Sequence, residues 1–318
     1  MGLTTNVYAA SESQPIKARN ALFIKLGAKG FWEKECIEHG YLKLGYHDIR
    51  HDDCIKGDWD AVNRFYLQEA NSKQQAASAH LTQIKYFYTE SQDTLWFTFF
   101  NQCLWWCFSK DTVTFNADKT KTRPVIGKWN NRDVRGNLLL LDNISGSLLK
   151  TQGFRGTICG TDELEYLLNK INSIESPEII KTKQSLSALE TSVMKLVAML
   201  QPKDFEVLVD LIFRQSGWQR MGVVGKTQKD IDLDLMMPVT GERAFVQIKS
   251  QSNEHEFNEY LDQFNEMVGY DHFFYVVHSP SNDLLAIDRG HPRLMTGPKI
   301  ASMVVRAGLT DWLMKKVG

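Results

Sequence analysis

The sequences DIDLD at residues 230–234 and FVQIK at residues 245–249 decide how the C-terminal part of this chain folds. Both alternate polar and apolar residues, which is the period-2 pattern of a half-buried β-strand. The intervening sequence PVTG at residues 238–241 is typical of a turn, so the two strands are expected to pair as a hairpin.

The alternation also predicts which side chains meet. Gln247 and Lys249 are two residues apart and share one face of their strand, whereas Val246 and Ile248 point to the other face and into the core. Asp232 lies on the first strand, where the hairpin register brings it to the same spot. A carboxylate, an amide oxygen and an ammonium group then converge. Together they can bind a hard divalent cation beside a water nucleophile.

A helix is expected just upstream of this hairpin. From residue 204 to residue 212, apolar side chains recur at i, i+3, i+4 and i+7, and Asp204 is a suitable N-cap. Glu206 falls in the first turn of this helix, and Gly217 and Trp218 follow its end. The apolar face consists of Phe205, Leu208, Val209 and Ile212.

The order of these elements resembles the PD-(D/E)XK nuclease superfamily in the form of the Mrr-like restriction endonucleases. In this resemblance Asp232 is the motif aspartate, Gln247 replaces the usual glutamate, and Lys249 is the motif lysine. The resemblance covers roughly residues 190–318. It implies a mixed sheet flanked by helices and cleavage of double-stranded DNA that depends on Mg²⁺ or Mn²⁺. Two departures are the absence of a glycine-rich approach in residues 225–232 and of a winged helix in the N-terminal half.

The resemblance also implies roles for the site residues. Asp232, with Glu206, would hold the metal, while the side chain of Gln247 and the carbonyl of Ile248 add neutral oxygens. Lys249 would position the attacking water or stabilise charge on the phosphate. Because glutamine carries no charge, metal binding is expected to be weak until a DNA phosphate supplies the missing anion.

A structural explanation of the same residues stays open. Polar residues on an edge hairpin are ordinarily solvated, and a lysine at an edge discourages strand pairing. An acid such as Glu206 is favoured in the first turn of any helix by the macrodipole. Asp230 and Asp234 are expected to be neighbours of the site, although a shift of register would exchange them with Asp232.

Composition places the chain among ordinary globular proteins. Its 318 residues are 43% hydrophobic and 24% charged, enough for two cores in an α/β (α+β) protein. We expect a domain at residues 1–172, a linker at 173–185 and a nuclease domain at 186–318. The chain shows no signal-peptide pattern and no apolar run of membrane-spanning length, so a cytoplasmic location without membrane contact is expected. The five cysteines are interpreted as buried free thiols.

The N-terminal part is expected to be rich in β-structure. The runs 95–100 and 104–108 predict a hairpin with a turn at residues 101–102, and further strands are expected near 84–89 and 136–141. Helices are predicted at 58–71 and 161–171, and beyond residue 172 at 187–200, 254–267, 299–307 and 311–316, with a strand at 273–278.

Residues 23–30 with Trp32, and the later strand 104–106, are similar to EVE-type members of the PUA superfamily, which hold modified bases. A base flipped from DNA would stack on aromatic rings. The alternative is that the tryptophans fill a β-barrel core. The candidates for stacking are Trp32, Trp59, Trp105 and Trp106.

The segment from Lys110 to Arg135 is locally basic, with seven basic and three acidic residues, and could follow a phosphate backbone. A solvated loop between strands would look similar. The basic residues offered for DNA contact are Lys119, Lys121, Arg123, Lys128 and Arg132.

These observations predict a metal-dependent DNA endonuclease of the restriction type, whose first domain selects foreign DNA that carries modified bases. Double-strand cleavage by a single active site implies a homodimer or successive nicks. One alternative is a repair nuclease that acts on branched or damaged DNA. The other is a nucleic-acid-binding protein with a degenerate, non-catalytic nuclease fold.

Overall fold

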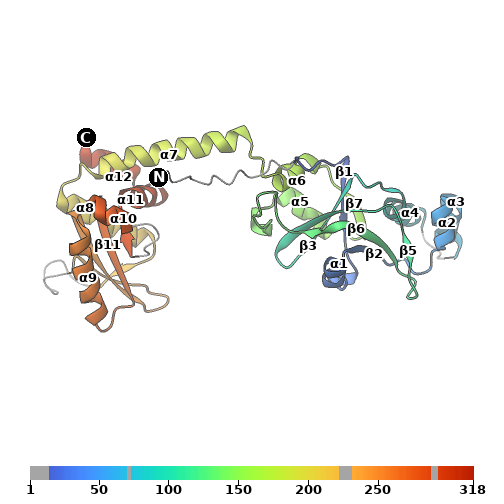
Figure 1. The fold of residues 1–318 in the computed structure, drawn as a ribbon, viewed down its shortest axis with the longest axis horizontal. Coiled ribbons are helices and arrows are strands. Elements are labelled where there is room, and N and C mark those ends of the chain that lie inside the picture. The colour runs from blue at the N-terminus through green and yellow to red at the C-terminus, as the bar shows by residue number, and fades with distance from the viewer. Residues whose placement is uncertain (1–13, 70–72, 222–230, 288–292) are drawn as a thin grey trace, which may run out of the picture. The chain divides into compact units, whose positions relative to one another are not determined.

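The computed structural model of the protein describes residues 14–69, 73–221, 231–287 and 293–318. The chain divides into two compact units, Met1–Ser176 and Pro177–Gly318, each with hydrophobic clusters of its own. Both units combine helices with a mixed sheet (Figure 1), which confirms the predicted α/β (α+β) class. No helix in the described ranges is long and apolar enough to cross a membrane.

The sheet of the N-terminal unit has the strand order β2-β6-β4-β3-β1-β7, with β5 paired to β6. Strands β1 and β3 run parallel, and the other neighbours run antiparallel. The strands are β1 Asn20–Ile24, β2 Tyr41–Leu44, β3 Thr94–Phe100, β4 Cys103–Ser109, β5 Thr114–Phe115, β6 Lys121–Asn130 and β7 Ile158–Gly160. The five cysteines are free, and all except the half-buried Cys159 are buried, which confirms the interpretation of their thiols.

The predicted aromatic hairpin is confirmed. Strands β3 and β4 pair with Phe100 opposite Cys103, so Asn101 and Gln102 form the turn. Both turn residues have positive φ angles, 48° and 60°, as the tight turn of a two-residue hairpin requires. The side chain of Trp96 on β3 is fully buried in the core beneath the sheet.

Two strand predictions in this unit are wrong. Residues 84–89 belong to helix α4 (Gln74–Thr89), where Ile84 and Phe87 lie one turn apart and are both fully buried. A short apolar run is compatible with the period of a helix and with that of a strand. These residues are helical because the earlier turns of the helix continue the same apolar face. Residues 136–141 make only isolated bridges, from Leu138 to Arg132 and from Leu140 to Cys103.

Short helices connect these strands. The expected helix at 58–71 is found as α3 followed by a π-helical turn, and the expected helix at 161–171 begins three residues later than predicted. The elements are η1 Ala28–Gly30, α1 Glu33–His39, α2 His51–Lys56, α3 Trp59–Arg64, η2 Phe65–Glu69, η3 Leu141–Asn143, α5 Gly146–Leu149, η4 Lys150–Gly153 and α6 Leu164–Ile171.

The C-terminal unit is built on a sheet with the order β12-β11-β10-β9-β8. Strand β10 lies in the middle, antiparallel to β9 and parallel to β11, and the predicted hairpin is therefore present. The strands are β8 Gln219–Arg220, β9 Leu233–Met236, β10 Arg243–Ser252, β11 His272–Pro280 and β12 Leu294–Met295.

Helices cover both faces of this sheet (Figure 1). Val246 and Ile248 of β10 face one cluster, together with α7, α8, α11 and α12. Phe245 faces the other cluster, which includes α9 and α10. The helices are α7 Pro177–Val197, α8 Pro202–Gln215, α9 Glu254–Glu266, α10 Asn282–Ile287, α11 Gly297–Arg306 and α12 Thr310–Val317.

Two boundaries differ from expectation. Residues 177–185, expected to belong to a linker, are helical, because α7 begins at Pro177, and α7 ends at Val197, three residues before the end of the helix predicted at 187–200. The first half of α7 is exposed and only Val193 and Val197 are buried, so the polar composition read as a linker is that of a solvated helix. Helix α8 is capped by Gln201 with Pro202 in its first turn, not by Asp204.

Two of the basic residues expected to contact DNA are instead inside the N-terminal unit. Lys121 and Arg123 of β6 are fully buried. The Arg123 guanidinium donates to the carbonyls of Phe87, Glu90 and Lys110 at 2.8–2.9 Å. At Arg123, the basic character that suggested DNA contact therefore reflects a guanidinium that joins α4 to the sheet.

Arg123→Ala is expected to lower the melting temperature by about 6–12 °C, because three carbonyls lose the donors of a fully buried guanidinium at a cost of about 3 kcal/mol. Lys128→Ala, at an exposed position of the same strand, should shift it by less than about 2 °C. Thermal unfolding followed by circular dichroism measures both. Equal shifts for the two variants would show that Arg123 does not join these elements.

Candidate active site

The hairpin register brings the expected side chains together at one end of β9. Val246 pairs with Leu233 in the last matched position, so Asp232 leaves β9 beside Gln247. The Oδ2 atom of Asp232 accepts a 2.7 Å hydrogen bond from the backbone N–H of Ile248. This bond replaces the next rung of the ladder and fixes the carboxylate against the strand that carries Gln247 and Lys249.

Burial dominates the electrostatics of Asp232. It raises the pKa of this carboxyl above its ordinary value, and the Ile248 N–H and the charges of Lys249 and Arg220 oppose the rise without cancelling it. Arg220 on β8 also donates to the Asp232 carbonyl at 3.3 Å. An ionised Asp232 is therefore a desolvated charge, and a bound cation would stabilise it.

Glu206 on α8 belongs to the same site. Its pKa is raised by burial and by the negative charge of Asp232, which places the two carboxyl groups within electrostatic reach. The helix positions Glu206 because the neighbouring Phe205 and Leu208 are fully buried in the core under β10. Two neighbouring acids make each other's ionisation less favourable, and a bound divalent cation would offset the repulsion between their charges.

Gln247 contributes an oxygen that lacks a partner. Its side chain is 5% exposed, and among the described residues its buried Oε1 atom has no hydrogen-bond donor. A buried acceptor left unsatisfied costs about 1–3 kcal/mol, so such an atom indicates a ligand. Within the described ranges, no three side chains of His, Cys, Asp or Glu are grouped as a metal site.

The backbone of Ile248 can add a further oxygen. In a strand, the N–H and C=O of one residue project toward the same edge. The Ile248 N–H points to Asp232, so its carbonyl points toward the same edge, past the last matched pair between β9 and β10. Two carboxylates, an amide oxygen and a carbonyl are the hard oxygen donors that Mg²⁺ prefers. The residues present therefore fit a magnesium ion.

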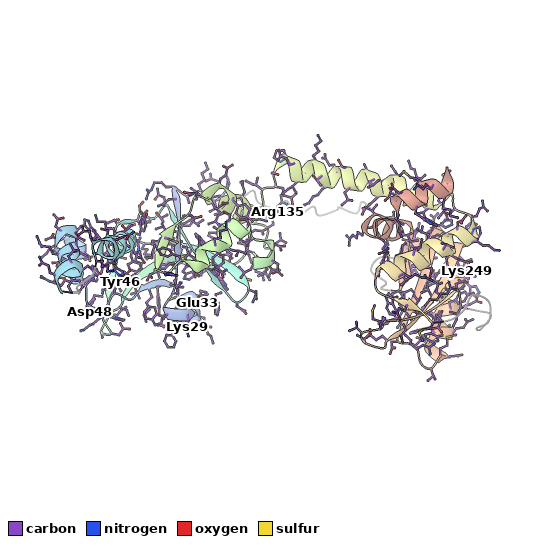
Figure 2. The ribbon with its side chains drawn as sticks, turned by 180° about the vertical axis from the view of Figure 1, so that it is seen from behind. Lys29, Glu33, Tyr46, Asp48, Arg135 and Lys249 are labelled. Atoms are coloured by element: carbon purple, nitrogen blue, oxygen red, sulfur yellow. The ribbon has the colours of Figure 1, made fainter. Side chains whose placement is uncertain are left out.

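Lys249, labelled in Figure 2, is held by residues that the sequence did not point to. Its Nζ atom lies 2.8 Å from Oε1 of Glu256 and 5.1 Å from the ring centre of Tyr260, both on α9. Burial lowers the pKa of Lys249, but the bonds to Glu256 and Tyr260 outweigh it and the pKa is raised. The lysine is therefore an ammonium ion at physiological pH. Because Glu256 and Tyr260 are four residues apart on a helix, the sequence indicates that their side chains lie on the same face.

The neighbouring aspartates are separated from this site. Asp234 forms a salt bridge of 2.9 Å to Arg243 and lies opposite Phe245. It is thus a neighbour and not a ligand, as the sequence suggested. Asp230 lies outside the described residues.

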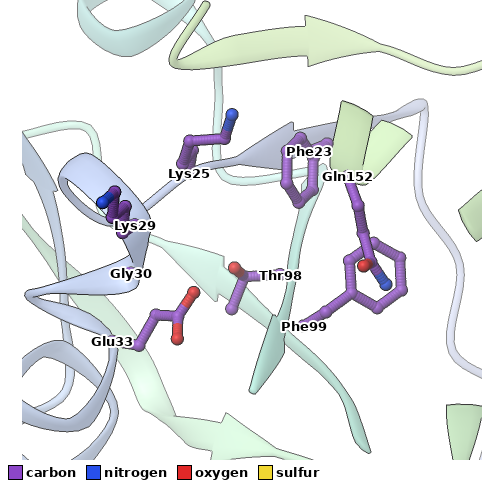
Figure 3. A pocket seen from close by; sticks show the side chains of 8 residues that line it. All are labelled: Phe23, Lys25, Lys29, Gly30, Glu33, Thr98, Phe99 and Gln152. Atoms are coloured by element: carbon purple, nitrogen blue, oxygen red, sulfur yellow. The ribbon is translucent and has the colours of Figure 1, made fainter. Parts of the chain in front are cut away.

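A cavity lies in the N-terminal unit, at the end of β1 (Figure 3). The cavity has a volume of about 330 Å³, and Figure 3 shows the Glu33 carboxylate and the Thr98 hydroxyl pointing into one space. Burial raises the pKa of Glu33, and no described residue forms a hydrogen bond or ion pair with its carboxylate. The cavity is lined by Phe23, Lys25, Lys29, Gly30, Glu33, Thr98, Phe99 and Gln152.

The four candidate tryptophans do not line this cavity. Trp106 is 9% exposed in the core, and the half-buried Trp105 packs against a core cluster, so neither offers a free ring face. Their indole N–H groups donate to the carbonyls of Arg132 and Phe100. Trp32 and Trp59 are half-buried and lie beneath lysine ammonium groups. These rings support the core alternative.

Part of the C-terminal unit is similar to a known family. Residues 197–279 match the family Mrr_cat, described as a restriction endonuclease. The matched segment runs from the end of α7 to β11 and contains all four candidate side chains. No curated protein and no solved structure matches the chain. The family match supports a nuclease of the restriction-endonuclease type in the C-terminal unit, with DNA as its substrate.

Asp232→Asn is expected to raise the melting temperature of the metal-free protein by about 1–3 °C at neutral pH. The pKa of Asp232 is raised in the fold, so the wild type loses stability as pH increases through that pKa, and asparagine does not. The gain should vanish below the pKa of an unfolded aspartate, about 4.

Thermal unfolding in EDTA at neutral and acidic pH tests this difference. Asp262→Asn, at an exposed position of α9, is the matched control and should change the melting temperature at neither pH. A lower melting temperature for Asp232→Asn at neutral pH would contradict the desolvation of the carboxylate.

Proposed function

We propose that the protein is a Mg²⁺-dependent DNA endonuclease of the restriction type, active on foreign DNA in the cytoplasm. The observation that carries the proposal is the Oε1 atom of Gln247, which has no hydrogen-bond partner among the described residues and lies beside the carboxylate of Asp232. When bound, Mg²⁺ or Mn²⁺ supplies Lewis acidity at the scissile phosphate and a more acidic water.

Each side chain of the chain has a distinct part in the proposed reaction. Asp232 and Glu206 provide negative charge, and Gln247 and the Ile248 carbonyl complete the oxygen set. Lys249, fixed as an ammonium ion, stabilises the charge that builds on the phosphate, and it cannot act as a base while protonated. Since the charges of two acids balance one divalent cation, the DNA phosphate adds a further anionic oxygen that strengthens metal binding and meets the ammonium group of Lys249.

The N-terminal unit is proposed to select the DNA. Lys119, Lys128 and Arg132 remain exposed and can contact phosphates. The cavity beside Glu33, and not the four candidate tryptophans, is the proposed place for a modified base, because a carboxylate accepts hydrogen bonds from an exocyclic amine. Cleavage of both strands then requires a homodimer or two successive nicks.

The nuclease is tested on supercoiled plasmid, methylated and unmethylated. Wild-type protein with Mg²⁺ should nick or linearise at least one plasmid, EDTA should stop the reaction, and Asp232→Ala should lower its rate at least ~100-fold. Asp234→Asn is the matched control, because this neighbour faces Arg243 and not the site.

Two outcomes would favour the alternatives. Retardation of DNA on a gel without metal-dependent turnover would support a non-catalytic binding protein. Cleavage confined to branched or damaged substrates would support a repair nuclease.

The proposed base cavity predicts a change of preference without a loss of chemistry. Glu33→Gln should alter the ratio of cleavage rates on the two plasmids by about threefold or more, because an amide offers both a donor and an acceptor where the carboxylate only accepts. Glu38→Gln, exposed on the same helix, should leave the ratio unchanged. An unchanged ratio for Glu33→Gln would remove this cavity from DNA selection.

A further inference from the structure

The contacts of Lys249 continue beyond the ion pair into a chain of buried hydroxyl groups. The second carboxylate oxygen of Glu256, Oε2, accepts a 2.8 Å hydrogen bond from Oγ of Ser252. Oγ of Ser252 lies 2.6 Å from the hydroxyl of Tyr275. Ser252 is 8% exposed and Tyr275 is fully buried, so this end of the chain is rigid.

Backbone structure fixes both ends of this arrangement. Asn253 caps α9 by accepting a hydrogen bond from the N–H of Glu256 at 2.9 Å, so the helix begins where Glu256 must stand. Tyr275 on β11 pairs with Gln247 on β10. The hydroxyl chain is thus anchored on the strand beside the proposed metal-binding oxygen.

We propose that Glu256, held by Ser252 and Tyr275, is a positioning residue that sets the rotamer of Lys249 for the nuclease reaction, with Tyr260 as a second wall. The proposal rests on the proposed nuclease function and adds to it a residue on α9. It concerns geometry, since a surface ion pair alone would add little stability.

The reason for such a device lies in the lysine itself. Lysine carries its charge on a flexible four-carbon stem, and fixing that stem costs rotamer entropy. An ammonium group has three N–H donors. Glu256 takes one, and the face of Tyr260 limits the tilt of the group. A donor that neither Glu256 nor Tyr260 takes is left for a phosphate oxygen or a water molecule.

The experiment is a double-mutant cycle in the full-length protein, measured as single-turnover cleavage of the supercoiled plasmid that the wild type cleaves fastest. Glu256→Ala should slow cleavage about 10–100-fold, because a misplacement of about 1 Å can cost on the order of 100-fold. Lys249→Ala should slow it at least as much. In the Lys249→Ala background, Glu256→Ala should change the rate less than about twofold, since it then has no lysine to position.

Further variants separate positioning from a loss of folding. Glu256→Gln keeps an oxygen for Lys249 and should recover most of the rate. Tyr275→Phe removes only the far hydroxyl and should slow cleavage by a few-fold at most. Glu259→Ala, exposed on α9 and facing His255, is the matched control and should match the wild type. Plasmid affinity, measured by fluorescence anisotropy with Ca²⁺ in place of Mg²⁺, should change less than about threefold in Glu256→Ala.

The outcomes are distinct. Independent, multiplicative losses for Glu256→Ala and Lys249→Ala would overturn the positioning role and assign Glu256 a separate one, such as metal binding. A wild-type rate for Glu256→Ala would overturn it while leaving the nuclease intact. No metal-dependent cleavage by the wild type on any plasmid would overturn the proposed function, and the positioning role with it.

Discussion

The bond from the Ile248 N–H to the Asp232 carboxylate is the constraint on which the candidate site depends. It lies where the β9–β10 ladder ends, after the pairing of Val246 with Leu233. A side-chain oxygen there replaces a backbone oxygen, so the chain can leave the sheet without orphaning a buried N–H. The same substitution holds the carboxylate beside Gln247. The same hydrogen bond thus ends the strand pairing and places the proposed metal-binding group.

The site is supported by a strand that is buried from both sides. Phe245 and Val246 are fully buried and face opposite clusters, so β10 cannot slip without moving its apolar residues into the wrong layer. This explains why the fold can hold an unpartnered amide oxygen and a desolvated carboxylate. Each is unfavourable by itself, and the apolar burial around them offsets the cost.

The sequence predicted the site better than the N-terminal unit, for physical reasons. In a strand, alternate residues point to opposite faces, so the apolar residues of 245–249 determine which face carries Gln247 and Lys249. Residues 84–89 had no such constraint, and the earlier turns of α4 decided their conformation. The charge of Arg123 did not predict its burial, because the partners of its guanidinium are carbonyls from distant segments. The role of Glu256 depends on the α9 docking angle, which local pattern does not encode.

The electrostatics of the site follow from the replacement of an acid by glutamine. A third carboxylate beside Asp232 and Glu206 would raise the repulsion between groups whose pKa values are already raised by burial. Gln247 supplies an oxygen without that charge, so the metal-free fold is less strained. The attraction for a cation is weaker for the same reason. Lys249 adds a positive charge to the site, and its ion pair with Glu256 partly offsets that charge. A nearly balanced site of this kind gains most from a phosphate, because the incoming anion is attracted by the lysine and completes the ligands of the cation.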